Sequence, residues 1–283
     1  MRTLFPSVAV LLSLLTGSAA SVAASGESLA QTLDRSATDL AEAQRLFYNG
    51  HYEAAAMLTL PLCVDDDQNA LLDACELRSS ALLFQIKRKL PKGMKKQDAY
   101  KACTACPPLM TAFQAVTRTG QSAARTGLKR APLDESTRFL LGKIDLNYVW
   151  LHLGLLGRKT GWGEYWEGRR AMDAVLETNP GHMRAQVSRA WIDYIVDTQA
   201  PRGTRWLLGG GNKKRGLRVV EDAAGVSGEP FVRAEAGFAL WDMRVREGNV
   251  AGAVVIAREL LRDFPENEEL NRFLADQDAV ALR

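Results

Sequence analysis

Apolar residues recur at helical spacing along most of the chain. Leu40, Ala43 and Leu46 follow one another at intervals of three, and the stretch 254–261 repeats this arrangement. Such spacing places the apolar side chains in one stripe along a helix. Runs that alternate apolar and polar residues, as half-buried strands do, are scarce. The pattern therefore predicts an all-α fold.

The same pattern predicts where helices begin and end. Helices are expected over residues 29–49, 52–62, 69–89, 95–104, 108–119, 134–157, 163–177, 182–198, 213–224, 230–246, 250–263 and 267–279. Turns are expected at Gly50 and over residues 63–67, 90–93, 127–132, 157–161, 201–211 and 227–229. No linker rich in Pro, Gly or Ser separates these helices, so one continuous domain over residues 25–283 is expected.

Residues 1–24 have the features of a cleavable signal peptide. Arg2 supplies a positive charge, an apolar stretch covers residues 4–15, and small residues follow, with cleavage sites after Ala20, Ala23 or Ala24. A membrane anchor is the alternative, but about a dozen apolar residues are too few to span ~30 Å of hydrocarbon. The mature protein is expected to be periplasmic or secreted, with no membrane span.

Four glycines share one local template, in which a small residue follows five positions later. The glycines are Gly50, Gly163, Gly211 and Gly248, and the small residues are Ala55, Gly168, Gly216 and Ala253. We expect each glycine to end a helix in the left-handed conformation. The small residue then lets two antiparallel helices approach closely, and a proline such as Pro180 or Pro265 ends the second helix.

This order of glycine, aromatic, small residues and final proline resembles the tetratricopeptide repeat. The best matches are residues 46–62 and 244–265, and the spacing between units is irregular. The resemblance implies an α-solenoid of stacked antiparallel helix pairs. The glycine-rich segment 207–216 also resembles the secreted T-component proteins of TRAP transporters, which are themselves degenerate tetratricopeptide folds.

Composition and charge narrow the class of protein. The chain has 283 residues, of which 47% are hydrophobic and 24% are charged, as in ordinary globular proteins. Its net charge of +3 is too small to indicate a nucleic-acid-binding protein, so no nucleic-acid partner is expected.

Four cysteines allow three disulfide pairings. Export to an oxidising compartment favours structural disulfides, and we favour Cys63 with Cys75 and Cys103 with Cys106. A redox dithiol at Cys103 and Cys106 and a zinc site are the alternatives. Pro107 follows the second cysteine where haem attachment would need His.

No constellation of residues indicates catalysis, a cofactor or a metal site. The three histidines are scattered at His51, His152 and His182. The glycines at 209–211 are followed by lysines but lack the spacing of a phosphate-binding loop. The sequence therefore predicts a protein that is not an enzyme.

Two surfaces are candidates for binding. The basic run over residues 87–96 fits either an anionic lipid or acidic partner, or a solvated helix end. The loop 201–211 is the longest departure from the template and carries Arg202, Arg205 and Trp206.

All six tryptophans lie between residues 150 and 241, which indicates either a bulky core or an aromatic-lined groove. For the groove, we expect Trp166 and Trp191 to complete a wall beside Trp206. The sequence thus predicts an exported, non-catalytic helical-repeat protein that binds a protein or peptide on its concave face. The alternative is a transporter-associated subunit that binds a small hydrophobic or amphipathic ligand.

Overall fold

A computed structural model describes residues 19–63, 68–226, 228 and 230–281. Within these residues the chain is helical and contains no strand, so the all-α prediction is confirmed. None of the helices in the described ranges is long and apolar enough to cross a membrane. Most of the expected signal peptide, residues 1–18, lies outside the described part of the chain.

The chain divides into a first unit that ends at Thr38 and a second unit, Asp39–Arg283. The helices are, in order, α1 (Ala19–Tyr48), α2 (Tyr52–Leu62), α3 (Gln68–Lys89), α4 (Lys96–Ala102), α5 (Cys106–Arg130), α6 (Glu135–Val149), the π-helical turn η1 (Trp150–Leu155), α7 (Trp162–Thr178), α8 (Met183–Gln199), the 3-10 helix η2 (Arg202–Leu208), α9 (Lys213–Ala224), α10 (Pro230–Arg246), α11 (Val250–Asp263) and α12 (Glu268–Ala281). The boundary between the two units falls within α1.

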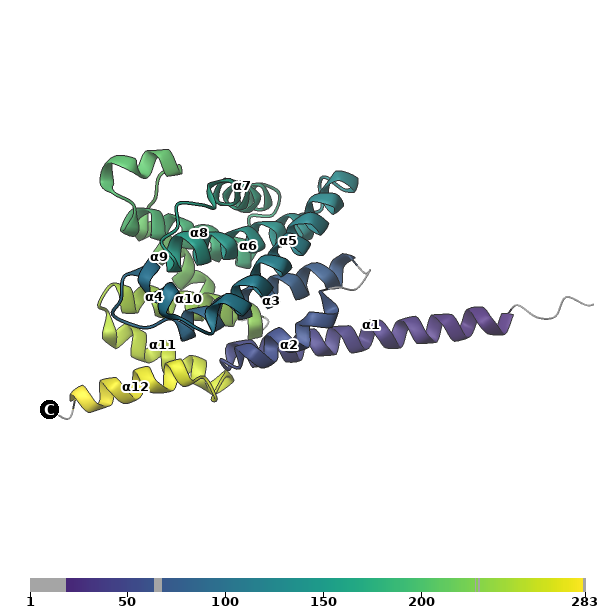
Figure 1. The fold of residues 1–283 in the computed structure, drawn as a ribbon, viewed down its shortest axis with the longest axis horizontal. Helices are drawn as coiled ribbons and strands as arrows, with labels where there is room; N and C mark the ends of the chain where they lie inside the picture. The colour runs from purple at the N-terminus through teal and green to yellow at the C-terminus, as the bar shows by residue number, and fades with distance from the viewer. Residues whose placement is uncertain (1–18, 64–67, 227, 229, 282–283) are drawn as a thin grey trace, which may run out of the picture. The chain divides into compact units, whose positions relative to one another are not determined.

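In the second unit, helices that are adjacent in the sequence pack as antiparallel pairs (Figure 1). The most extensive contacts join α6 to α7, α8 to α9, and α3 to both α2 and α5. The helices pair because each buries its stripe of apolar side chains against the next helix. Ala190 and Tyr194 of α8, for example, are buried against Val220 of α9 in one hydrophobic cluster.

Three expected helix ends are wrong. The helix expected to begin at residue 29 begins at Ala19 as α1. The helix expected to stop at residue 119 continues to Arg130 as α5, with Gly120 and Gly127 inside it. A Cβ on Gly120 would lie 3.2 Å from the Cβ of Cys75, so glycine here permits α5 to approach α3. The helix expected over 134–157 ends at Val149 and continues only as the π-helical turn η1.

The glycine template is correct at two of its four turns. Gly50 and Gly248 have φ of 83° and 70°, the left-handed conformation that ends a helix. Gly163 and Gly211 do not have positive φ, and the left-handed residue before α7 is Gly161. Gly163 is an exposed residue inside α7, and a Cβ added to it would meet no neighbouring element within 4 Å, so its expected turn and packing roles are wrong.

Gly211 has a different role from the one expected. A Cβ at this position would lie 2.6 Å from the backbone nitrogen of Asp197 and 2.7 Å from the carbonyl oxygen of Asp193. The chain therefore crosses α8 at the turn between Asp193 and Asp197, and only glycine permits this approach. The left-handed residues at this turn are Gly209 and Gly210.

The structure places all four small residues of the template at close helix contacts. Ala55 and Ala253 are fully buried. A Cβ on Gly168 would lie 3.1 Å from the carbonyl oxygen of Gly142, and one on Gly216 would lie 2.7 Å from that of Ala190. These positions set how near α7 comes to α6, and α9 to α8.

Both favoured cysteine pairs are disulfides. Cys63–Cys75 joins the end of α2 to α3, and Cys103–Cys106 joins the end of α4 to the start of α5. All four cysteines are buried in the largest hydrophobic cluster. The first disulfide therefore holds the connection between α2 and α3, and the second holds the connection between α4 and α5. Both lie in the hydrophobic core that these helices share.

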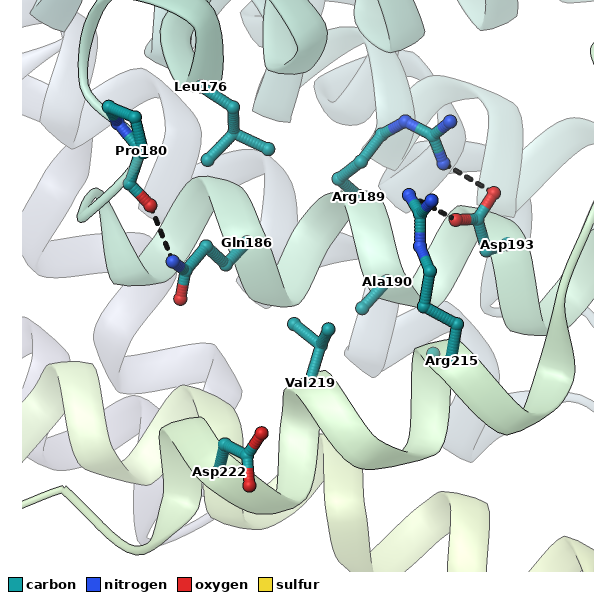
Figure 2. Close-up of a pocket in the computed structure, with 10 residues that line it drawn as sticks. Leu176, Pro180, Gln186, Arg189, Ala190, Asp193, Arg215, Val219 and Asp222 are labelled. Carbon is teal, nitrogen blue, oxygen red and sulfur yellow. Dashed lines mark hydrogen bonds and ion pairs between the residues drawn. The ribbon is translucent and has the colours of Figure 1, made fainter.

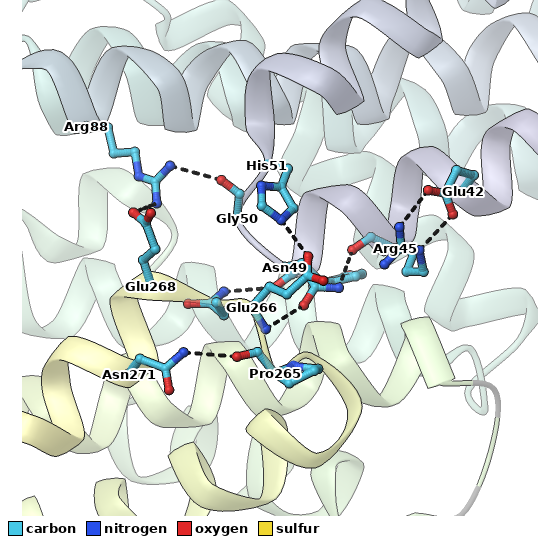
Figure 3. Close-up of polar contacts among 12 residues, drawn as sticks. Glu42, Arg45, Asn49, Gly50, His51, Arg88, Pro265, Glu266, Glu268 and Asn271 are labelled. Carbon is cyan, nitrogen blue, oxygen red and sulfur yellow. Dashed lines mark hydrogen bonds and ion pairs between the residues drawn. The ribbon is translucent and has the colours of Figure 1, made fainter.

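The loop between α1 and α2 contacts the start of α12 (Figure 3). The amide of Asn267 donates to the carbonyl oxygen of Tyr48 over 2.7 Å, and the backbone N–H of Glu266 donates to Asn49. The ring of Tyr48 stacks on Phe238 of α10, with centroids 5.6 Å apart. The N-terminal part of the second unit is thus joined to its last helices.

The basic run at the end of α3 contributes to this junction. Arg88 donates to the carbonyl oxygen of Gly50 and forms an ion pair with Glu268, while Lys87 pairs with Glu269. Two cations of the run expected over 87–96 therefore hold α12 instead of facing an open surface.

Candidate partner-binding groove

A groove of about 390 Å³ runs along α8 between α7 and α9 (Figure 2). It is lined by Leu176, Pro180, Gln186, Arg189, Ala190, Asp193, Arg215, Gly216, Val219 and Asp222. We call it the α8 groove. Its volume falls within the range of ~300–1,000 Å³ that is usual for ligand sites.

The helix-period spacing of α8 places Arg189 and Asp193 one turn apart along the groove. Arg189 donates to Asp193 over 2.5 Å and to Asp173 of α7 over 2.6 Å. Burial disfavours the charge on Arg189, but these hydrogen bonds outweigh it and raise the pKa of the guanidinium. Arg189 is therefore a fixed cation that ties α8 to α7.

Arg215 is the accessible cation of the groove, and Asp222, further along α9, is an exposed carboxylate. Arg215 enters from the first turn of α9 and contacts Asp193 at 3.2 Å, yet 63% of its side chain is exposed. Asn212 caps this turn by accepting a hydrogen bond from the backbone N–H of Arg215. The guanidinium therefore keeps donors free for an incoming acceptor while Asp193 fixes its direction.

The floor of the groove is apolar. Ala190 is buried, and Leu176 and Val219 are partly buried on the flanking helices. Gly216 removes a side chain at the point where α8 and α9 are closest. An apolar floor bordered by a directed cation suits a segment with one apolar and one acidic side chain.

The loop 201–211, on which the sequence places the functional surface, adjoins this groove but does not line it. Arg205 pairs with Asp197 of α8, and the second oxygen of that carboxylate accepts from the backbone N–H of Lys213. Arg205 thus holds the loop against α8 and α9 instead of facing a ligand. The side chain of Arg202 lies outside the described part of the structure.

The three tryptophans expected to form one wall have different surroundings. Trp206 is 73% exposed, and its indole N–H donates to the carbonyl oxygen of Gly203. Trp166 packs on the cluster around Ile192, whereas Trp191 packs in the cluster shared by α8, α9 and α10, where it stacks on Tyr194. The expected single aromatic wall is wrong, because the two helix tryptophans belong to separate hydrophobic clusters.

A cluster of charges joins four helices, α3, α6, α8 and α10. Each of them is the first helix of a contacting pair: α3 with α5, α6 with α7, α8 with α9, and α10 with α11. Glu235 of α10 accepts from Lys143 of α6 over 2.5 Å and from Arg184 of α8 over 2.7 Å. Arg184 also contacts Glu76 of α3 at 3.4 Å. Burial by itself would raise the pKa of Glu235, but Lys143 and Arg184 lower it to about 2. We call this the first-helix face, and its charges already satisfy one another.

The described residues contain no group of three or more His, Cys, Asp or Glu side chains that could hold a metal ion. Sequence reasoning did not find the α8 groove. Arg189 and Asp193 show the i, i+4 spacing of a helical ion pair, which was an available signal. The contact of Asp193 with Arg215 of α9, across the loop that follows α8, had no local signature.

Comparisons of the chain with models of protein families, with curated proteins and with solved structures found no match.

Proposed function

We propose that the protein is an exported helical-repeat binding protein that takes an extended segment of a partner protein in the α8 groove. The single observation that carries the proposal is the exposed guanidinium of Arg215 beside the apolar floor of a groove of about 390 Å³. A partner segment with an acidic side chain next to an apolar one fits these two features.

The proposal includes a degenerate tetratricopeptide-like solenoid. It is supported by the sequence-adjacent helix pairs and by close contacts at Ala55, Gly168, Gly216 and Ala253. A periplasmic or secreted location is part of the same proposal. The signal-peptide pattern of residues 1–24 and the two disulfides support it.

In a solenoid of this kind the concave face is the usual binding surface. Here the first-helix face carries Glu76, Lys143, Arg184 and Glu235 in mutual ion pairs. A ligand there would have to break partly buried ion pairs, which is unfavourable. In the α8 groove the side chain of Arg215 is 63% exposed although it contacts Asp193, so we place the partner in the groove.

The test is a peptide selection on the purified mature protein, followed by affinity measurement by fluorescence anisotropy. Selected peptides are expected to carry an acidic residue adjacent to an apolar one. Arg215→Ala should weaken their binding about tenfold or more, because it removes a charge-assisted hydrogen bond. Val219→Glu should weaken binding by placing a charge on the apolar floor.

The matched control is Arg233→Ala, which removes an exposed arginine that also pairs with a carboxylate, Asp263, but on α10 and α11. It should leave peptide affinity unchanged. Failure of any peptide to be enriched would contradict the proposed function. Equal affinities for the Arg215, Val219 and Arg233 variants would contradict the groove as its site.

The second candidate is a transporter-associated subunit that binds a small amphipathic ligand, as the T-component resemblance implies. The groove volume favours it, because about 390 Å³ also suits a small molecule. Native mass spectrometry of exported protein distinguishes the two functions. A bound small molecule that Val219→Glu removes would support this candidate in place of a peptide partner.

A further inference from the structure

The most exposed aromatic side chain among the described residues belongs to the loop between α8 and α9. Trp206 is 73% exposed, and its neighbour Leu207 is 52% exposed. We call these two residues the Trp206 tip. The loop that carries them projects beyond α8 and α9 at the upper left of Figure 1. Exposing two large apolar side chains in sequence is unfavourable in water and indicates a binding surface.

The Trp206 tip is held in place by its base. Tyr165 of α7 donates to the carbonyl oxygen of Leu208 over 2.7 Å, and Arg169 donates to that of Gly209 over 2.8 Å. Leu208 packs on the buried cluster of Tyr165, Ile192 and Val196. These anchors follow the tip, and the ion pair of Arg205 with Asp197 precedes it, so Trp206 and Leu207 stay exposed instead of folding back.

Cations follow the tip in the chain, at the start of α9. The carboxylate of Asp197 pairs with Arg205 through one oxygen and accepts from the backbone N–H of Lys213 through the other. The residue before Trp206 is therefore fixed beside the start of α9. Lys214 and Arg218, one helical turn apart on α9, are exposed, and neither lines the α8 groove.

We propose that the Trp206 tip and the α9 cations dock the protein onto an anionic lipid surface. Tryptophan is favoured at the level of the lipid headgroups, where its ring is partly buried. Transfer of the leucine side chain from water into the acyl region beneath the headgroups lowers the free energy. Lys214 and Arg218 supply attraction to the phosphates of anionic headgroups.

A lipid surface fits this site better than a protein partner does. The tip is a convex projection of two side chains, and a protein would need a preformed hollow to receive it. A bilayer deforms around a projecting indole and leucine, and its anionic headgroups complement the cations of α9. The surface is separate from the α8 groove, so a peptide partner and a membrane could be bound together.

The test is co-sedimentation of the mature protein with vesicles made of equal parts of phosphatidylglycerol and phosphatidylcholine. The protein should bind these vesicles, bind pure phosphatidylcholine vesicles much less, and lose affinity as salt increases. Trp206→Ala combined with Leu207→Ser should weaken binding about tenfold or more. Lys214→Gln and Arg218→Gln should each weaken it about fivefold.

Two matched controls isolate the surface. Leu60→Ser changes a leucine of α2 that is 50% exposed, close to the value for Leu207. Lys129→Gln with Arg130→Gln removes two exposed cations at the end of α5. Both controls should bind vesicles like the wild type. Circular dichroism checks that every variant keeps its helices.

Trp206→Phe gives a second readout that does not depend on affinity. Brominated acyl chains should quench part of the wild-type tryptophan emission, and this part should be absent in Trp206→Phe. The proposal is overturned if the wild type ignores anionic vesicles, or if the tip variant binds them unchanged. It is also overturned if the tip variant loses affinity only for selected peptides, since the tip would then contact a protein. Arg215→Ala should keep full vesicle binding, which separates this test from that of the α8 groove.

Discussion

Two glycines that lie inside helices, Gly163 of α7 and Gly216 of α9, have opposite surroundings. A Cβ on Gly216 would lie 2.7 Å from the carbonyl oxygen of Ala190, and backbone atoms cannot yield easily. No atom lies within 4 Å of the corresponding position at Gly163. Both are helical glycines in the sequence, and only the neighbouring helix distinguishes them.

We expect Gly216→Ala to lower the free energy of unfolding by ~1–3 kcal/mol, because the added methyl group forces α8 and α9 apart. Gly163→Ala is the control. It should raise the free energy of unfolding by a few tenths to about 1 kcal/mol, because alanine restricts the unfolded chain. Urea unfolding measures both values. Equal effects of the two substitutions would show that α8 and α9 are not in close contact.

Among the elements, α5, α6 and α7 meet at a buried carboxyl group. Asp145 of α6 is fully buried and accepts from Gln121 of α5 over 2.7 Å. Burial and the neighbouring Glu167 of α7 raise the pKa of Asp145 to about 8. Arg125 of α5 holds the Glu167 carboxylate by two hydrogen bonds and lowers the pKa of that group.

This raised pKa makes stability depend on pH. Between the ordinary aspartate pKa of about 4 and about 8, the folded protein binds a proton at Asp145 that the unfolded chain does not hold. The contribution of Asp145 is therefore complete at acid pH and is lost as pH rises to about 8. We expect Asp145→Asn to lose less stability than the wild type between about pH 5 and about pH 9 in urea unfolding. Asp278→Asn, at an exposed site, should follow the wild type, and a parallel loss in Asp145→Asn would refute the account.

At the scale of the second unit, the contact between the α1–α2 loop and α12 changes how the helix pairs depend on one another. Repeats in an open array contact only their neighbours, so the end repeats loosen first. Here the buried Asn267 holds both ends. Its amide donates to the carbonyl oxygen of Tyr48, and its Oδ1 caps α12 by accepting from the backbone N–H of Leu270.

Asn267→Ala should lower the free energy of unfolding by about 2 kcal/mol, through the lost cap and the lost hydrogen bond to Tyr48. Hydrogen exchange should then speed up in α2 as well as in α12. Asn249→Ala is the matched control, because Asn249 caps α11 but is exposed. It should cost about 1 kcal/mol and leave exchange in α2 unchanged. Unchanged exchange in α2 of Asn267→Ala would mean that the two ends are independent.

Much of the fold could be predicted from local pattern. The bounds of α9, α10 and α11 coincide with the expected ranges, because caps such as Asn212 and Asn249 lie at the helix starts. The expected end of α5 at residue 119 is wrong, because the helix continues through Gly120. Glycine is needed at position 120 because Cys75, on another helix, lies too close for a larger side chain. The candidate site was missed in the same way, since Arg215 acquires its direction only from Asp193.

The sequence by itself determined the all-α class, most helix bounds and the two cysteine pairs. These depend on interactions within one helix or between residues close in the chain, which the pattern of apolar, capping and cysteine residues contains. Only the tertiary structure decided that Arg205 is an anchor, that Trp206 is exposed while Trp166 and Trp191 pack in separate clusters, and that α8 and α9 form a groove. The same residue type is core, anchor or free surface according to what packs against it from a distant part of the chain, and local spacing carries no record of that neighbour.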